Sequence, residues 1–342
     1  MAKLKLAVIY GGMSTENEVS CVSANSVINN LNKEKYEIFP IYISKDGCWY
    51  QVNDIENIKD KKEIENVMKY LKNVDVIFPV LHGLYGEDGT IQGMLELLQK
   101  PYVGCKVLAS SVGMDKVYSK IVFEKAKINQ AKYVYIRKYN ENYIYVNNNF
   151  DEQVFNIKDT INKIINELKF PMFIKPSNSG SSVGINKAHD RNELEKAIKE
   201  AEKYDNKILI EEGIKGREVE CAVLGNEDVI TSCIGEVKAA EEFYSYDAKY
   251  NNQESKTIIP AEVPKQKVDE IQKLAIKAFK AIDGKGLSRV DFFIEDETEK
   301  IYINEINTLP GFTSISMYPK LFANEGIQYS ELLDKLIELS VK

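Results

Sequence analysis

The chain has 342 residues, of which 44% are hydrophobic and 28% are charged, a composition typical of soluble globular proteins. Its 52 acidic and 45 basic side chains give a net charge of −7, which argues against nucleic acid or an anionic membrane as a general partner. No apolar run reaches the length of a membrane span, and the N-terminus leads directly into a predicted strand. We therefore expect a cytoplasmic protein.

The cysteines and histidines limit the chemistry that the chain can support. The five cysteines are odd in number and show no Cys-x-x-Cys spacing, which predicts reduced, mostly buried thiols and no zinc site. Only two histidines occur, His82 and His189. Acid–base chemistry must therefore fall mainly to other groups.

Strands and helices alternate through the first hundred residues. Strands are predicted at 4–10, 36–44 and 74–81, and helices from about 15, in the later 60s and at 90–98. The first helix opens with the Thr15 to Glu18 spacing of a capping box. This alternation predicts a parallel, helix-flanked sheet, and two glycines after the first strand indicate a ligand crevice at its carboxyl end.

Two further sections complete the predicted organisation. The second contains a helix at 110–127, an irregular loop at 139–151, a strand at 170–176, a helix at 193–203 and a strand at 206–214. The third contains several strands, a helix at 265–282 and a final amphipathic helix at 330–339. The predicted domains are an N-terminal α/β domain at 1–104, a central subdomain at 105–213 and a C-terminal subdomain at 214–342.

A β-hairpin is predicted at 288–308. Each half is rich in β-branched and aromatic residues, and the polar stretch 295–300 connects the two halves. Because residues two apart share a strand face, a turn centred near Thr298 places Asp291 opposite Glu305. Two carboxylates about 5 Å apart repel each other, so a positive charge is expected between them.

The same register places Arg289 opposite Asn307, so four polar side chains converge on one patch of the hairpin. Asp, Glu and Asn oxygens are hard ligands that suit magnesium, which takes its remaining ligands from water and substrate phosphates. The alternative is a solvated polar face with Arg289 as the counter-ion, because surface charge pairs are common.

Several other segments have two interpretations each. The Gly/Ser-rich loop at 177–184, preceded by Lys175, is either a flexible cover over phosphates or a plain hairpin turn. It lacks the Gly-Lys-Ser/Thr ending of a P-loop. Taken alone, Lys116 is interpreted as a solvent-exposed lysine. The acidic residues at 211–218 are either surface charges at the ends of strands or part of a domain hinge. The segment 310–317 is a connector or binds an anion.

Together these features indicate ATP-driven chemistry on a small acid, and the chain resembles the D-alanine–D-alanine ligases of the ATP-grasp superfamily over almost its whole length. The matching segments are Gly-Gly-x-Ser-x-Glu-x-Glu-Val-Ser at 11–20, His-Gly-x-x-Gly-Glu-Asp-Gly at 82–89, Lys-Pro at 175–176 with Gly-Ser-Ser-Val-Gly at 180–184, the stretch 244–250, and Arg-Val-Asp at 289–291 with Asn-Thr-x-Pro-Gly at 307–311. The resemblance implies α/β and α+β architecture, with an N-terminal parallel α/β domain followed by a two-part ATP-grasp fold.

The resemblance also implies a reaction for peptidoglycan precursor synthesis. ATP phosphorylates the carboxylate of one D-alanine, and the amine of a second D-alanine attacks the acyl phosphate, releasing D-alanyl-D-alanine, ADP and phosphate. Asp291, Glu305 and Asn307 would hold magnesium, with two ions expected and manganese as a substitute. The resemblance further implies a homodimer with no membrane or nucleic-acid partner.

Residue roles are carried over from the resemblance. Those implied to bind ATP are Lys116, Lys175, Ser181, Ser182, Glu211, Glu212, Ile214, Glu218, Tyr244 and Lys249. Those implied in catalysis are Glu16, Ser181, Tyr250, Arg289, Gly311 and Ser316. Those implied to contact the D-alanines are Glu16, His82, Tyr250, Ser316 and Met317. Glu16 would bind the first ammonium, linked to Ser181 and Tyr250, and Arg289 with the Gly311 N–H would stabilise the oxyanion of the tetrahedral intermediate.

Two places bear on the predicted product. The segment 243–250 ends in Lys-Tyr, as in ligases that make D-alanyl-D-alanine, and its tyrosine argues against a hydroxy acid. D-Alanine–D-serine ligases usually place Arg after the serine that matches Ser316, whereas Met317 stands here and suits a methyl group. Ile315 stands where many relatives have His. A D-alanine–D-serine ligase is thus one alternative. The other alternative is a nucleotide-binding regulator without catalytic activity. The presence of all four polar hairpin residues, Arg289, Asp291, Glu305 and Asn307, argues against it.

Overall fold

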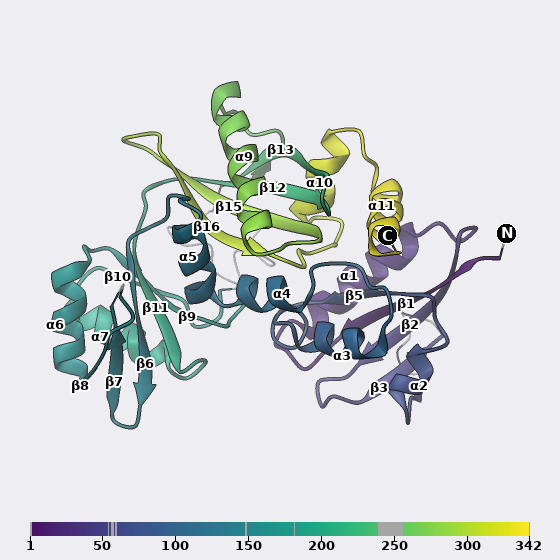
Figure 1. Ribbon diagram of the computed structural model, residues 1–342, viewed down its shortest axis with the longest axis horizontal. Helices are drawn as coiled ribbons and strands as arrows, with labels where there is room; N and C mark the ends of the chain where they lie inside the picture. Colours follow the sequence, from purple (N-terminus) through teal and green to yellow (C-terminus); the bar gives the residue numbers. More distant parts are fainter. Residues whose placement is uncertain are drawn as a thin grey trace.

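The computed structural model describes residues 2–53, 55, 58, 60–147, 149–180, 182–238 and 256–341. These residues form three sheets, each built from its own stretch of the chain (Figure 1). The sequence predictions for Ser181, Tyr244, Lys249 and Tyr250, and for the segment 243–250 as a whole, lie outside the described residues.

The first sheet has the strand order β4-β3-β2-β1-β5. Its parallel centre consists of β1 (Leu4–Gly11), β2 (Tyr36–Ile43) and β5 (Val76–Leu81), which confirms the three predicted strands. Two antiparallel strands that the sequence analysis did not include, β3 (Trp49–Val52) and β4 (Lys61–Glu63), extend one edge. Every residue of β5 is buried, as expected for a strand covered on both faces.

Helices α1 (Asn17–Asn30), α2 (Val67–Leu71) and α3 (Thr90–Leu98) belong to this first domain. The predicted capping box is wrong, because α1 begins at Asn17 and its N-cap residue, Glu16, makes no side-chain cap hydrogen bond. The Ser14 hydroxyl instead accepts from the Glu16 N–H and donates to the His82 carbonyl, which ties the turn to the end of β5. Glu16 is thereby placed on the wall of a cavity.

The second sheet has the order β10-β9-β11-β6-β7-β8. Its strands are β6 (Tyr133–Tyr139), β7 (Asn142–Val146), β8 (Glu152–Phe155), β9 (Met172–Pro176), β10 (Asn186–Ala188) and β11 (Lys207–Glu212), and its helices are α6 (Ile157–Glu167) and α7 (Arg191–Ala201). The predicted irregular loop at 139–151 is wrong, because β7 occupies its first half. Tyr143 and Tyr145 are both buried on alternate positions of β7, which is the pattern of a strand.

The predicted helix at 110–127 is two helices, α4 (Val107–Met114) and α5 (Lys116–Lys125). Asp115 has extended backbone angles between them, and its carboxylate accepts from two main-chain N–H groups in the first turn of α5. Lys116 is therefore the first residue of α5, not a residue one turn inside a longer helix.

The third sheet has the order β14-β13-β12-β15-β16. Its strands are β12 (Gly216–Gly225), β13 (Val229–Lys238), β14 (Lys256–Ile258), β15 (Gly286–Glu295) and β16 (Ile301–Asn307), and its helices are α9 (Lys265–Ala281), α10 (Met317–Asn324) and α11 (Tyr329–Val341). Alternate residues of β12 face two different cores. Cys221 packs in the core that contains α9, and Ala222 packs in the core that contains α10 and α11.

The core under α10 and α11 continues into the first domain. The ring of Phe312 meets that of Phe78 edge to face, with centroids 6.0 Å apart, so the first and third sheets share one apolar interior. The second sheet has a separate core. The domain boundaries at 104 and 213 stay predictions, and α4 and α5 contribute residues to the core of the third sheet.

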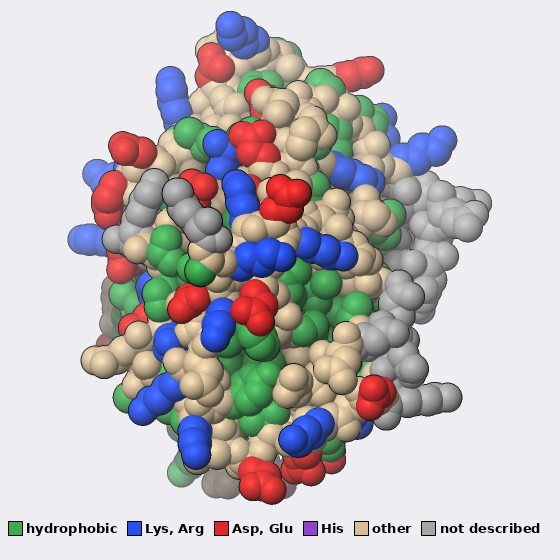
Figure 2. Space-filling model, turned by 90° about the vertical axis from the view of Figure 1, so that its right-hand side faces the viewer, with side chains coloured by type: hydrophobic (Ala, Val, Ile, Leu, Met, Phe, Trp, Pro, Cys, Tyr) green, Lys and Arg blue, Asp and Glu red, His purple; other side chains and the backbone are tan. Residues whose placement is uncertain are grey.

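Charged side chains of both signs lie on the surface, and most of the cysteines lie in the interior. On the face shown in Figure 2, basic and acidic side chains are interspersed, so neither sign of charge dominates that face. All five cysteines are free, and three of them are buried. Within the described ranges, no helix combines the length and apolar character needed to cross a bilayer.

Candidate active site

A cavity of about 210 Å³ brings together residues that are far apart in the sequence. Its walls come from the first domain, from α5, from the Gly/Ser-rich loop and from the third sheet. The predicted site residues that line it are Glu16, His82, Lys116, Ser182, Glu218, Arg289, Asp291, Glu305, Asn307, Gly311, Ser316 and Met317.

The hairpin of β15 and β16 confirms the predicted register, with Asp291 opposite Glu305 and Arg289 opposite Asn307. A β-bulge follows Asp291, because the next pair along the ladder is Phe292 with Ile303. Asn304 is the extra residue, and its Oδ1 accepts a hydrogen bond from the Lys175 ammonium at 3.3 Å. The bulge thus joins the hairpin to the second sheet.

Arg289 and Asp291 form a two-pronged ion pair. Arg289 Nε donates to Asp291 Oδ1 at 2.7 Å, and Nη2 donates to Oδ2 at 2.6 Å. Glu220 Oε2 lies 3.1 Å from Arg289 Nε. Burial would lower the pKa of Arg289, but the Asp291 and Glu220 carboxylates raise it well above its ordinary value. Arg289 is indeed a counter-ion, but this patch is not a solvated surface, because Asp291 is 2% exposed.

The oxygen donors of the hairpin fit magnesium. Among the residues that the structure describes, no three His, Cys, Asp or Glu side chains cluster as a metal site. Asp291, Glu305 and Asn307 provide two carboxylates and one amide, and magnesium needs few protein ligands because it keeps waters and binds substrate phosphates. Asn307 Nδ2 donates to Asp291 Oδ2 at 3.0 Å, and the amide oxygen is the atom through which Asn307 would bind an ion.

Two lining residues from the first domain, His82 and Glu16, are both buried. His82 Nε2 lies 2.9 Å from the Ser23 hydroxyl. Burial lowers the pKa of His82, although the Glu16 carboxylate opposes the shift, so the ring is neutral at pH 7. Burial and then Glu16 raise the pKa of Glu87 to about 8. Glu87 was not predicted as a site residue, although it lies within the matching segment 82–89.

Two glycines make room for the Glu16 carboxylate. A Cβ atom at Gly83 would lie 2.4 Å from Glu16 Oε2, and one at Gly180 would lie 2.5 Å from the same oxygen. Gly83 also has a φ of +73°, a conformation that favours glycine. Glu16 therefore lies between the end of the first sheet and the Gly/Ser-rich loop.

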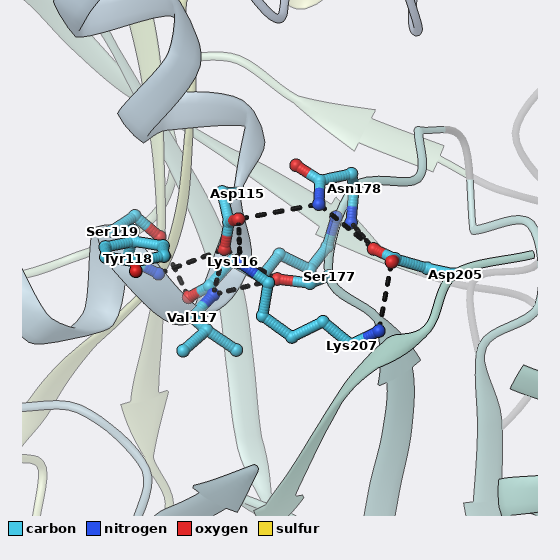
Figure 3. A network of polar contacts seen from close by, with 9 residues as sticks. All are labelled: Asp115, Lys116, Val117, Tyr118, Ser119, Ser177, Asn178, Asp205 and Lys207. Atoms are coloured by element: carbon cyan, nitrogen blue, oxygen red, sulfur yellow. Dashed lines mark hydrogen bonds and ion pairs between the residues drawn. The ribbon is translucent and has the colours of Figure 1, made fainter. Parts of the chain in front are cut away.

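A polar network fastens the root of the Gly/Ser-rich loop to the start of α5 (Figure 3). Asp115 Oδ1 accepts from the Ser177 hydroxyl at 2.6 Å, and its Oδ2 pairs with Lys207. The Asn178 N–H donates to Asp205 at 2.8 Å. Lys116 Nζ donates to the Ser179 carbonyl at 2.6 Å, so this lysine is bonded to the loop, and it also lines the cavity.

Four residues implied to bind ATP, Lys175, Glu211, Glu212 and Ile214, are not on the cavity wall. Glu211 pairs with Lys175 at 2.5 Å and with Lys120 at 2.7 Å. Burial would raise the pKa of Glu211, but the two lysines lower it to about 2. Glu212 Oε1 accepts from the Lys169 N–H at 2.9 Å, so its side chain is engaged elsewhere. Lys120 was not predicted as a site residue. In the sequence, only its position one helical turn after Lys116, on the same helix face, could have indicated a role.

The end of the cavity near α10 carries the residues implied for the second substrate. Ser316 is the N-cap residue of α10, and its hydroxyl accepts from the Thr313 N–H at 2.9 Å. Met317 is buried at the first position of the helix, whereas Ile315 is exposed on the wall. A Cβ at Gly311 would lie 2.8 Å from Ser316 Oγ, so these two residues are close neighbours.

Comparison with known proteins gives the family. Models described as D-ala D-ala ligase N-terminus and D-ala D-ala ligase C-terminus match residues 5–105 and 122–338. The chain belongs to the D-alanine–D-alanine ligase family. It is 48% identical to the D-alanine–D-alanine ligase of Acetivibrio thermocellus, over 99% of this chain and 96% of that protein. It is 49% identical to that of Clostridium acetobutylicum, over 99% and 98% of the two chains.

Solved structures of the ligase family share the fold. The VanG D-Ala:D-Ser ligase from Enterococcus faecalis aligns with a TM-score of 0.87 at 37% identity, over 99% of this chain and 100% of that one. The D-alanine–D-alanine ligase from Coxiella burnetii aligns with a TM-score of 0.84 at 32% identity, over 100% and 94%. The predicted combination of an α/β domain with a two-part ATP-grasp fold is confirmed.

Proposed function

We propose that this protein joins two D-alanines to D-alanyl-D-alanine for peptidoglycan precursor synthesis, converting ATP to ADP and phosphate through a D-alanyl phosphate. The observation that carries the proposal is that one cavity brings Glu16 of the first domain together with Arg289 of the third sheet and the N-terminus of α10. This arrangement suits substrates that carry an ammonium group and a carboxylate.

The D-alanines would bind in this cavity. Glu16 would accept the ammonium of the first D-alanine, and His82, neutral at pH 7, would contact the same subsite. Arg289 and the Gly311 N–H would stabilise the oxyanion that forms when the second amine attacks. The Ser316 hydroxyl would bind the second carboxylate near the positive end of α10.

ATP would bind on the side of α5 and the second sheet. Lys116 and Lys175 would hold phosphates, and Glu218 would hold the ribose. Glu211, Ile214 and the main chain of Glu212 would bind the adenine, because the Glu212 side chain is already bonded to Lys169. Ser182 and its loop would close over the phosphates and exclude water. The roles of Ser181, Tyr244, Lys249 and Tyr250 stay predictions.

Asp291, Glu305 and Asn307 would hold magnesium. When bound, this ion offsets negative charge on the phosphate being transferred. Two ions, and the substitution of manganese, stay predictions. Arg289 pairs with both Asp291 and Glu220, so an ion bound at Asp291 would replace one of its two carboxylate partners.

The second subsite decides between D-alanine and D-serine. Met317 is an apolar residue of the cavity lining, which favours a methyl group over a hydroxyl that would need a hydrogen-bond partner. The likeness to a D-Ala:D-Ser ligase structure keeps D-serine as the second candidate.

The deciding experiment supplies ATP, magnesium and equal concentrations of D-alanine and D-serine, and measures the dipeptides by mass spectrometry. We expect D-alanyl-D-alanine to predominate. Predominant D-alanyl-D-serine would overturn the choice of second substrate. Absence of any ADP release that depends on D-alanine would instead favour a regulator without chemistry.

We also propose a homodimer. Leu97 on α3 is 81% exposed and Leu108 on the neighbouring α4 is 61% exposed, so these helices present apolar side chains to solvent. Sedimentation of the full chain measures the oligomeric state, and a monomer at micromolar concentration would contradict this proposal.

A further inference from the structure

Three charged side chains meet behind the cavity. Glu211 lies on β11, Lys175 on β9 and Lys120 on α5. Each oxygen of the Glu211 carboxylate has its own ammonium group, with Lys175 Nζ 2.5 Å from Oε1 and Lys120 Nζ 2.7 Å from Oε2. The side chains of Lys120 and Glu211 are 3% and 6% exposed, and that of Lys175 is 12% exposed. We call these residues the Lys-Glu-Lys cluster.

The proposed function uses only two members of the cluster. Lys175 is assigned to the phosphates of ATP and Glu211 to the adenine, and Lys120 has no assigned role. Lys120 does not line the cavity, and its ammonium lies 5.3 Å from the centre of the Tyr133 ring. It reaches the cluster from the helix that begins with Lys116.

The two lysines differ in what they can reach. Lys175 Nζ also donates to Asn304 on β16, next to the proposed metal ligand Glu305, so it lies toward the site where phosphates would bind. Lys120 belongs to α5, and its buried side chain extends from that helix to Glu211 on β11. Only Lys175 is therefore placed to exchange its contact with Glu211 for a contact with a substrate phosphate.

A buried carboxylate needs a compensating charge, because an ion left alone in the interior loses the stabilisation that water provides. If Lys175 were the only cation near Glu211, its movement toward a phosphate would leave that carboxylate uncompensated. The second ammonium, from Lys120, keeps Glu211 compensated throughout. The free-energy cost of moving Lys175 away from Glu211 is then much smaller.

We propose that Lys120 is a positioning residue for ATP binding: it neutralises Glu211 so that Lys175 is released to a phosphate of ATP. This inference rests on the proposed function of Lys175 in ATP binding. Lys120 itself does not touch the nucleotide. Its effect on affinity therefore passes through Glu211 and Lys175.

The test measures the dissociation constant of ATP with magnesium, by calorimetry, together with the KM for D-alanine. Lys120→Met should weaken ATP binding by about tenfold or more, with the KM for D-alanine changed by less than about twofold. Lys125→Met removes an exposed lysine from the same helix and is the matched control, with no expected change. Lys120→Arg keeps the cation and should retain most of the affinity.

A double-mutant cycle separates this role from a purely structural one. In a Glu211→Gln background there is no carboxylate to hold Lys175, so adding Lys120→Met should change ATP affinity by less than about threefold. An equal loss in both backgrounds would overturn the inference, as would unchanged ATP affinity in Lys120→Met. Failure of the wild-type protein to bind ATP would instead overturn the proposed function, so the two failures are distinguishable.

Discussion

At the scale of single residues, the Glu16 carboxylate depends on space that only glycine leaves. It fits between Gly83 and Gly180, and a side chain at either position would come within 2.5 Å of Glu16 Oε2. Gly180 belongs to the Gly/Ser-rich loop and Gly83 to the first domain. Because Gly83, Glu16 and Gly180 are in close contact, the Gly/Ser-rich loop lies near the subsite proposed for the first D-alanine.

Gly180→Ala should therefore displace the Glu16 carboxylate and raise the KM for D-alanine by about tenfold or more, because substrate positioning is sensitive to small shifts. The KM for ATP should change much less. Gly93→Ala is a matched control, since a Cβ at Gly93 meets nothing within 4 Å. Steady-state kinetics of both variants check this, and similar KM values in wild type and Gly180→Ala would contradict it.

At the scale of elements, the break between α4 and α5 sets the position of Lys116. Asp115 caps α5, accepts from the Ser177 hydroxyl and pairs with Lys207. One carboxylate thus joins a helix, a loop and a strand (Figure 3). Because the loop root and α5 share this carboxylate, Lys116 and the loop are held in one geometry.

Asp115→Ala should lower the free energy of unfolding by roughly 2 to 4 kcal/mol, from the lost cap and the broken, largely buried ion pair. It should also weaken ATP binding. Asp190→Ala is the control, because Asp190 caps α7 in the same way away from the cavity. That variant should lose about 1 kcal/mol and keep its ATP affinity. Urea unfolding and calorimetry measure both, and equal ATP affinities in the two variants would contradict the role of Asp115.

At the scale of the whole molecule, Phe312 joins the first domain to the third sheet. Its ring is 1% exposed and lies within 6.2 Å, centroid to centroid, of Phe78, Tyr318 and Tyr329. The second sheet keeps its own core. The first and third sheets should therefore unfold together, whereas the second sheet should unfold partly independently of them.

Phe312→Ala should lower the free energy of unfolding by about 3 to 5 kcal/mol and reduce amide protection in both β1 and β15. Tyr143→Ala is the control, because Tyr143 is also a buried aromatic residue but lies in the separate core of the second sheet. That variant should leave amide protection in β1 unchanged. Hydrogen exchange measures this, and protection lost only in β15 for Phe312→Ala would show that the two sheets are not one unit.

The sequence by itself determined the hairpin register, the central strands of the first sheet and the class of chemistry. Side-chain alternation along a strand has a period of two, and a turn of known length then sets which residues face each other. The pairing of Asp291 with Glu305 was therefore predictable from neighbours along the chain.

Only the tertiary structure decided the break at Asp115, the bulge that brings Asn304 to Lys175, and the position of Lys120 behind Glu211. Each depends on contacts between segments that are far apart in the sequence, and local periodicity carries no information about such contacts. The strand β7 was missed for the same reason, because its Asn- and Tyr-rich composition is typical of loops until burial of the tyrosines against α6 and α7 is known.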